Sequence, residues 1–234
     1  MVLGSGDTPR YDVALKNKNR RKIISVLAQL GGEASFAQIE HASNIQGNTL
    51  VHNLAVLQRY NIINKPVKGK YGLRYKTPIC YMFGPPNTYH VVYLGLLGRK
   101  EGRDIPETEV ALKLLEKEGI MPKLVYVATT PQALQEWSEL KPPYRWVTLY
   151  EDEIFDINSV KNRVRPQLEN LIEDYVVILD CTSATKPATI ALYELANQYL
   201  IPLIYVYEPI QRLTWLLSKD ELIQRIEIRI SNTV

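Results

Sequence analysis

Residues 176–207 read VVILDCTSATKPATIALYELANQYLIPLIYVY, and this stretch decides the fold of the larger part of the chain. It holds two runs that are apolar on both faces, VVILD and LIYVY, separated by a helical pattern. Continuous apolar runs of this length are typical of parallel strands buried between helices, and a helical crossover usually joins such strands. The stretch therefore predicts a strand, a loop, a helix and a second, parallel strand.

The same alternation of apolar runs and helical patterns extends upstream to residue 89. We predict strands at 89–97, 123–130 and 145–150, with a possible final strand, RIEIRI, at 225–230. We predict helices at 106–119, 131–140 and 160–175. This order of elements predicts an α/β fold in which residues 89–234 form a doubly wound, mostly parallel, Rossmann-like sheet.

Such sheets bind ligands beyond the carboxyl ends of their strands, near the point where the strand order reverses. Two segments leave predicted strands in a way that suits a ligand. Residues 95–102 supply glycines that permit close backbone approach, together with the cations Arg99 and Lys100. Residues 180–187 bring hydroxyl groups and Lys186 to a helix N-terminus, where free N–H groups favour an anion. We therefore expect a ligand that carries phosphate, although neither GxGxxG nor GxxxxGK[ST] occurs.

The sequence TSATKP, residues 182–187, resembles the Thr-Gly-Gly-Thr-Lys-Pro signature of CRISPR-associated Rossmann-fold (CARF) domains. The glycine-containing turn after YHVVYLGLL and the segment VYVATTPQA are similar to the same family, so the resemblance covers residue 89 to about residue 208. Ser183 and Ala184 stand where the signature has two glycines. Their Cβ atoms restrict how closely the backbone can approach a ligand.

CARF domains are known as dimeric sensors of cyclic oligoadenylates, so the resemblance implies a homodimer that binds one ring across its two-fold axis. It favours cyclic tetra-adenylate as the effector and implies neither a metal nor another cofactor. The ligand contacts that the resemblance and the two loops suggest are Gly95, Gly98, Arg99, Lys100, Thr129, Thr130, Thr182, Ser183, Ala184, Thr185 and Lys186.

A ring nuclease is the alternative function. Some CARF-type domains cleave the cyclic oligoadenylate through its own 2′-hydroxyl, without a metal. In that case the resemblance implies that Lys186 stabilises charge on the scissile phosphate and that Ser183 aligns the attack.

Charge is distributed unevenly along the chain. Residues 1–88 contain 12 Lys and Arg against 4 Asp and Glu, a net charge of +8, whereas residues 89–234 contain 16 against 21 and carry −5. The sign changes at GPPNT, residues 84–88, which has neither helix nor strand character. We therefore predict two domains, 1–84 and 89–234, of which the first meets a polyanion.

The first domain contains three helical patterns. The first runs from Asp12 to Leu30, and the second covers residues 35–44 with Ser35 as its N-cap. The third begins near Asn48 and has leucines at i, i+4 and i+7. Two β-prone runs, YNIINKPV and RYKTPICYMF, follow on either side of the basic tip KGKYG, which predicts a hairpin.

This order of elements resembles the winged helix-turn-helix domains of archaeal and bacterial transcription regulators, which bind double-stranded DNA. Polar side chains on the third helix would reach base edges, and basic side chains would neutralise phosphates. The candidate DNA contacts are Gln46, Asn48, Thr49, His52, Asn53, Lys68, Lys70, Arg74 and Lys76. A module of this kind can instead serve oligomerisation or protein contact.

The two predicted domains together indicate a CRISPR-associated transcription regulator that responds to a cyclic oligoadenylate. Known regulators of this class carry the winged helix after the sensor, whereas here it comes first. We expect a cytoplasmic protein, because the sequence has no signal-peptide pattern and no apolar run approaching the roughly 18 residues of a membrane span. Cys80 and Cys181 belong to no metal-binding or CxxC pattern, so we expect both in the core.

Overall fold

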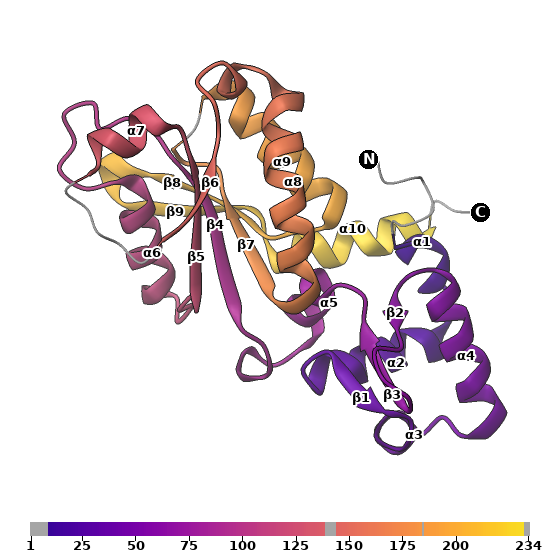
Figure 1. Ribbon diagram of the computed structural model, residues 1–234. Helices are drawn as coiled ribbons and strands as arrows, with labels where there is room; N and C mark the ends of the chain where they lie inside the picture. Colours follow the sequence, from indigo (N-terminus) through magenta and orange to yellow (C-terminus); the bar gives the residue numbers. More distant parts are fainter. Residues whose placement is uncertain (1–8, 139–143, 184, 232–234) are drawn as a thin grey trace. The chain divides into compact units, whose positions relative to one another are not determined.

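The structure, a computed structural model, describes residues 9–138, 144–183 and 185–231 (Figure 1). The chain divides into two compact units. The first comprises the residues up to Tyr89 together with those from Lys219 onward, and the second runs from His90 to Ser218. The second unit is therefore inserted into the sequence of the first, whereas the sequence pattern assigns everything after residue 89 to one domain.

A six-stranded sheet forms the centre of the second unit, with the strand order β6-β5-β4-β7-β8-β9. Its strands are β4 (Val91–Leu97), β5 (Leu124–Thr129), β6 (Arg145–Thr148), β7 (Val176–Asp180), β8 (Leu203–Tyr207) and β9 (Arg212–Leu217). Neighbouring strands are parallel, except that β8 and β9 are antiparallel. The predicted α/β class with a mostly parallel sheet is confirmed, and β9 is a strand that the sequence pattern missed.

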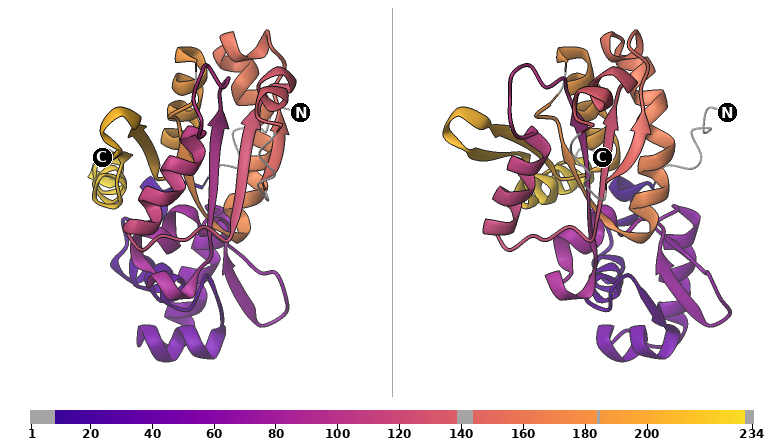
Figure 2. Two further views of the ribbon diagram at one scale, coloured as in Figure 1. Left: turned by 90° about the vertical axis from the view of Figure 1, so that its left-hand side faces the viewer. Right: turned by 60° about the vertical axis from the view of Figure 1, so that its left-hand side comes forward.

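Helices cover both faces of this sheet (Figure 2). They are α6 (Glu107–Lys117), α7 (Pro131–Glu136), α8 (Ile157–Asp174) and α9 (Lys186–Tyr199), with the short turns η2 (Glu153–Phe155) and η3 (Glu208–Ile210). Helices α8 and α9 pack side by side on one face, and α6 packs on the other. The chain passes from β4 to β5 and β6 on one side and places β7 on the other, so the strand order reverses between β4 and β7.

The core explains why the central strands are apolar on both faces. Tyr93 of β4, Ile178 of β7 and Ile204 of β8 are fully buried. They form one cluster with Ala111 and Leu115 from the inner side of α6. On the opposite face, α8 buries one side chain per turn, which gives it a single apolar stripe. The central strands β4 and β7 are thus removed from water on both faces.

The first unit combines helices with a small antiparallel sheet of order β1-β3-β2. Its elements are α1 (Tyr11–Ala14), α2 (Lys18–Gln29), β1 (Glu33–Ser35), α3 (Phe36–Ser43), α4 (Gly47–Arg59), β2 (Ile63–Asn64), β3 (Lys70–Leu73), α5 (Lys76–Phe83), η1 (Pro86–Thr88) and α10 (Lys219–Ser231). The second and third helices of the sequence pattern are confirmed as α3 and α4.

Short-range signals set the limits of these helices. The Ser35 hydroxyl accepts the Gln38 N–H at 3.3 Å while the Gln38 side chain accepts the Ser35 N–H at 2.9 Å, a reciprocal cap that starts α3. The prediction of one helix from Asp12 to Leu30 is wrong. The Asn17 side chain accepts the N–H groups of Asn19 and Arg20, so a new helix, α2, begins at Lys18.

The predicted hairpin is only partly correct. Strands β2 and β3 pair, with residues 65–69 between them, but the second β-prone run, residues 74–83, forms α5 instead of a strand. Pro78 has no N–H to give to a sheet and suits the first turn of a helix. Ile79 and Cys80 are then buried on this helix.

The predicted final strand RIEIRI is also wrong, because residues 219–231 form the helix α10. Leu222 and Ile226 lie four residues apart on one side and are buried, and the helix packs against α1 and α5. Asp220 and Glu221 in its first turn favour a helix start. Within residues 225–230, Ile alternates with charged residues as in a strand. Over the whole segment, however, the buried side chains are four residues apart, which is the spacing of a helix.

Two further expectations concern burial and membranes. Cys80 and Cys181 are free and buried, as predicted. None of the helices in the described ranges combines the length and the apolar character that crossing a bilayer requires.

Candidate ligand-binding site

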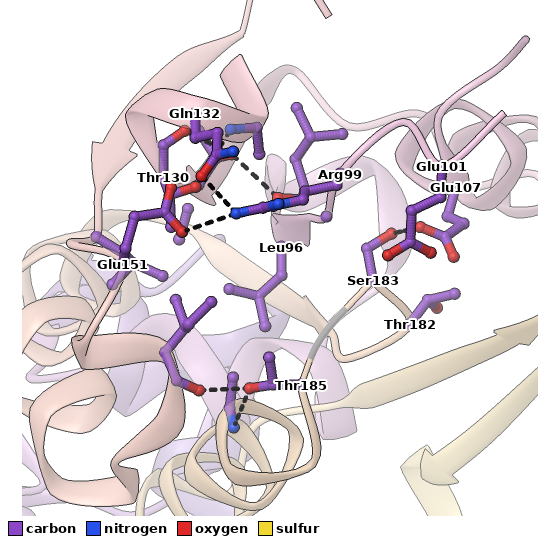
Figure 3. Close-up of a pocket in the computed structure, with 18 of the residues that line it drawn as sticks. Leu96, Arg99, Glu101, Glu107, Thr130, Gln132, Glu151, Thr182, Ser183 and Thr185 are labelled. Atoms are coloured by element: carbon purple, nitrogen blue, oxygen red, sulfur yellow. Dashed lines mark hydrogen bonds and ion pairs between the residues drawn. The ribbon is translucent and has the colours of Figure 1, made fainter. Parts of the chain in front are cut away.

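A cavity of about 760 Å³ opens at the carboxyl ends of β4, β5 and β7 in the second unit (Figure 3). Its walls come from the loops after β4 and β7, from the start of α7 and from η2. This is the switch point of the sheet, where α/β folds of this kind place their ligands. The volume lies within the range of small-molecule sites.

The loop after β7 is anchored from below by a buried carboxylate. The Tyr93 hydroxyl donates to Asp180 Oδ2 at 2.5 Å, and the Thr182 N–H donates to Asp180 Oδ1 at 2.8 Å. The Thr182 hydroxyl donates to the same Oδ1 and accepts the Val206 N–H at 2.8 Å. Thr182 is therefore fixed between β7 and β8 before any ligand arrives.

Burial governs the ionisation of this pair. Burial raises the pKa of Asp180 to about 6, against the opposing hydrogen bonds from Thr182 and Tyr93. Burial, and then the negative charge of Asp180, raises the pKa of the Tyr93 phenol well above its usual value of about 10. Tyr93 therefore stays a neutral donor to the carboxyl group at neutral pH.

Gly95 supports this anchor from inside β4. A Cβ atom at this position would lie 2.7 Å from two ring carbons of Tyr93, so only glycine leaves room for the ring. Gly95 is buried within the strand and does not line the cavity. The structure gives Gly95 a packing role beside Tyr93, and its contact with a ligand stays a prediction.

Glu107 connects the two loops. Its carboxylate accepts from the Ser183 hydroxyl through Oε2 (Figure 3). The same carboxylate pairs with Arg103 through Oε1. Arg103 also donates to the backbone carbonyls of Arg99, at 2.7 Å, and Lys100, at 3.3 Å. An acidic side chain thus lies between a cation of the first loop and a hydroxyl of the second.

Arg99 lies on the opposite wall of the cavity (Figure 3). Its guanidinium donates to Gln132 Oε1 at the start of α7 and lies 3.7 Å from Glu151 Oε2. The Lys100 ammonium instead lies 5.6 Å from the ring centroid of Trp137, and the Lys100 N–H donates to Glu136 at 2.8 Å. Lys100 is therefore directed toward α7, and it does not line the cavity.

Three threonines at the cavity hold the local backbone. The Thr130 and Thr185 hydroxyls cap α7 and α9 by accepting the N–H groups of Ala133 and Ala188. Thr129 donates to the Leu97 carbonyl at 3.0 Å and so ties β5 to the end of β4. Thr185 also donates to the Ile154 carbonyl of η2.

The structure brings most of the predicted ligand residues together. Those that line the cavity are Gly98, Arg99, Thr129, Thr130, Thr182, Ser183 and Thr185. Lys186 is exposed at the first residue of α9 and lies outside the lining, and Ala184 falls outside the described residues.

Sequence reasoning missed several lining residues, namely Glu101, Arg103, Glu107, Gln132, Glu151 and Phe155. The one available signal was Glu107, because PETE opens a predicted helix directly after the first ligand loop. Counting charged side chains, the lining holds two arginines and three glutamates. Within the described ranges, no three His, Cys, Asp or Glu side chains are arranged to hold a metal ion.

The predicted DNA contacts of the first unit fall into two groups. Gln46, Asn48, Thr49 and His52 are exposed on α4, whereas Asn53 is buried and its amide donates to the Thr49 carbonyl at 2.8 Å. The Asn53 side chain is therefore packed inside the first unit, where it bonds to the backbone of its own helix.

The predicted basic contacts are divided in a similar way. Lys68 and Lys70 are exposed at the β2–β3 connection and at the start of β3. Arg74 lies 5.7 Å from the ring centroid of Tyr75. The carbon stem of Lys76 covers Gly32. Of the four predicted basic contacts, the two exposed lysines thus lie at the hairpin.

The second unit thus combines an α/β fold with a cavity at the switch point of its sheet. No protein-family model and no curated protein matches the sequence. One similar solved structure is Can2 from Sulfobacillus thermosulfidooxidans in complex with cyclic tetra-adenylate, at 17% identity and a TM-score of 0.40 over 56% of this chain and 36% of that chain. Another is Csm6 from Enterococcus italicus bound to cyclic hexa-2'-fluoro-hexa-dAMP, at 14% identity and a TM-score of 0.41 over 61% and 39%. This chain thus spans well under half of either protein.

Proposed function

We propose that the protein is a DNA-binding regulator of a CRISPR system, in which the second unit is a CARF domain that senses a cyclic oligoadenylate. The observation that carries this proposal is the cavity at the switch point. Thr182, Ser183 and Thr185 of the TSATKP segment line one space there, and Arg99 lies on its opposite wall. The N-terminus of α9 and a cation across the cavity suit the phosphates of a nucleotide ring.

A homodimer would match the symmetry of such a ligand. A ring with two-fold symmetry is bound best by two equivalent sites, so each protomer would hold one half. Large side chains that are exposed on α9 and at the end of β8 support self-association: Ile190, Tyr193, Tyr205 and Tyr207. These elements adjoin the loop after β7, so a second copy that covered them would lie beside the ligand.

DNA binding would be the work of the first unit, as a winged helix. The exposed polar side chains of α4 suit base edges in the major groove, and Lys68 and Lys70 at the hairpin suit the phosphate backbone. The net charge of +8 over residues 1–88 favours a polyanion.

Ring binding is tested by calorimetry with cyclic tri-, tetra- and hexa-adenylate. We expect one ring to bind per dimer, with cyclic tetra-adenylate preferred. Arg99→Ala and Lys186→Ala should each weaken binding about 10-fold, or about 1.4 kcal/mol. Lys117→Ala is the matched control, because it removes an exposed cation from the last turn of α6, outside the cavity. Failure of all three rings to bind would reject the proposal.

DNA binding is tested by titration with duplex DNA at several salt concentrations. Binding by the first unit should weaken steeply as salt rises, because each neutralised phosphate releases a counterion. Lys68→Ala with Lys70→Ala should reduce that dependence. Affinity that is absent, or independent of salt, would favour the alternative in which the first unit serves oligomerisation.

A ring nuclease is the second candidate, favoured by the contact between the Ser183 hydroxyl and the Glu107 carboxylate inside the cavity. Positioned groups of this kind can align a 2′-hydroxyl with its neighbouring phosphate. Chromatography of the ring after incubation with the protein is the test. A linear product that is lost with Ser183→Ala would establish cleavage. An intact ring would reject the nuclease and leave sensing as the proposed function.

A further inference from the structure

We propose that Glu107 occupies the place of a ligand phosphate between the two loops, and that an incoming phosphate must displace it. The inference deepens the proposed function and rests on it for the identity of the ring. In this arrangement, the charge of Glu107 limits the affinity of the cavity for anions.

Glu107 makes two contacts inside the cavity, one with each loop. Its two carboxylate oxygens take a hydroxyl donor, Ser183, and a guanidinium donor, Arg103. A hydroxyl and a guanidinium are the donors that a phosphate oxygen would seek. The Glu107 side chain is only 14% exposed, so the carboxylate is held in the wall of the cavity and not in free solvent.

Arg103 keeps its place without Glu107. The guanidinium of Arg103 is fixed by the backbone carbonyls of Arg99 and Lys100, and its side chain is 26% exposed. Displacement of the carboxylate would therefore leave a positioned cation beside the Ser183 hydroxyl. A preorganised pair of donors binds an anion without further ordering.

Ser183 determines where the Glu107 carboxylate is held. Glycine has no hydroxyl, so the serine at this position supplies the bond that draws the carboxylate across to the loop after β7. A bound phosphate at the same donors would meet the negative charge of Glu107 at close range, which disfavours binding while the carboxylate stays. Glu107 thus sets a threshold that only a ligand with several other contacts overcomes.

The decisive experiment compares Glu107→Gln with wild type. The amide keeps the size of the side chain and removes its charge, so affinity for cyclic tetra-adenylate should rise about 10-fold. Glu116→Gln is the matched control, because it removes an exposed carboxylate from the same helix, α6, outside the cavity. It should change affinity less than 2-fold.

Two further measurements keep the inference separate from the proposed function. Ser183→Gly removes a donor that Glu107 and an incoming phosphate share, so in combination with Glu107→Gln it should cancel part of the 10-fold gain in ring affinity. Pyrophosphate, a simple phosphate anion, should bind Glu107→Gln more tightly than wild type when followed by calorimetry.

The outcomes are distinct. Tighter binding of pyrophosphate by Glu107→Gln, with no ring bound by either protein, would support the inference and reject the proposed ligand. Binding of the ring by wild type that is unchanged or weaker in Glu107→Gln would overturn the inference and leave the proposed function intact.

Discussion

The loops after β4 and β7 meet at the same cavity but are held in opposite ways. The loop after β7 is fixed by hydrogen bonds among buried groups, Tyr93, Asp180 and Thr182. The loop after β4 is held by charged groups, through the exposed ion pair of Arg99 with Glu151 and the part-buried pair of Arg103 with Glu107. A buried polar network is costly to disturb, whereas an exposed ion pair contributes little to stability. One loop thus belongs to the core, and the other is held by groups that respond to charge.

The largest effect should come from Gly95→Ala, beneath the loop after β7. The new Cβ would displace the Tyr93 ring and weaken its hydrogen bond to Asp180, so we expect the free energy of unfolding in urea to fall by about 3–4 kcal/mol. Gly98→Ala is the control, because its Cβ would lie 3.8 Å from the nearest atom and should cost less than about 1 kcal/mol. Equal losses in both variants would remove the distinction between the two loops.

The next effect is a dependence of stability on pH. The pKa of Asp180 is about 6 in the folded protein and about 3.9 in an unfolded chain, so its contribution is complete below pH 4 and is lost as the pH rises through 6. From pH 4 to 7 we expect a loss of about 2 kcal/mol from this group.

Asp180→Asn isolates that contribution. The exposed carboxyl groups of Glu153 and Asp156 have lowered pKa values, and their contribution is lost instead as the pH falls. The useful quantity is therefore the difference between the urea unfolding curves of wild type and Asp180→Asn at each pH. A difference that stays constant between pH 4 and 7 would contradict the raised pKa.

A smaller effect is expected for Thr182→Val. The substitution keeps the shape of the side chain but removes the hydroxyl that donates to Asp180 and accepts from the Val206 N–H, so unfolding should become easier by about 2 kcal/mol. Thr182→Ser keeps both bonds and should cost less than about 1 kcal/mol. If valine proves as stable as serine, the hydroxyl does not anchor the loop.

The smallest effect should be that of Arg99→Ala on stability. Arg99 and Glu151 are about half exposed, with side-chain accessibilities of 48% and 43%, so solvent screens their interaction. We expect the free energy of unfolding to change by less than about 0.5 kcal/mol, while ring affinity falls. A loss comparable to that of Thr182→Val would place the loop after β4 in the core as well.

The sequence predicted the centre of the sheet well because strands such as β4 and β7 bury both faces and so consist of continuous apolar runs. The sequence prediction was wrong in two segments whose residues fit both a strand pattern and a helix pattern. In residues 74–83, β-prone side chains surround Pro78, and in 225–230 isoleucines alternate with charges, yet both segments are helical. Tertiary packing of one face decided these cases against local propensity.

The candidate site was predicted from one loop and missed from the other. Thr182, Ser183 and Thr185 follow a strand directly, so their position at the sheet edge could be read from the sequence. Glu107 lies 76 residues from its partner Ser183, and their contact depends on how the two loops close over the sheet. Such a contact leaves no local pattern in the chain.

The return of the chain to its first unit has a consequence for the order of synthesis. Helix α10, which buries Leu222 and Ile226 against its own unit, is translated only after the whole six-stranded sheet. During translation, the apolar surface on α1 and α5 that α10 later covers stays exposed until residues 90–218 and α10 itself have been synthesised. The N-terminal unit is therefore the last to be completed.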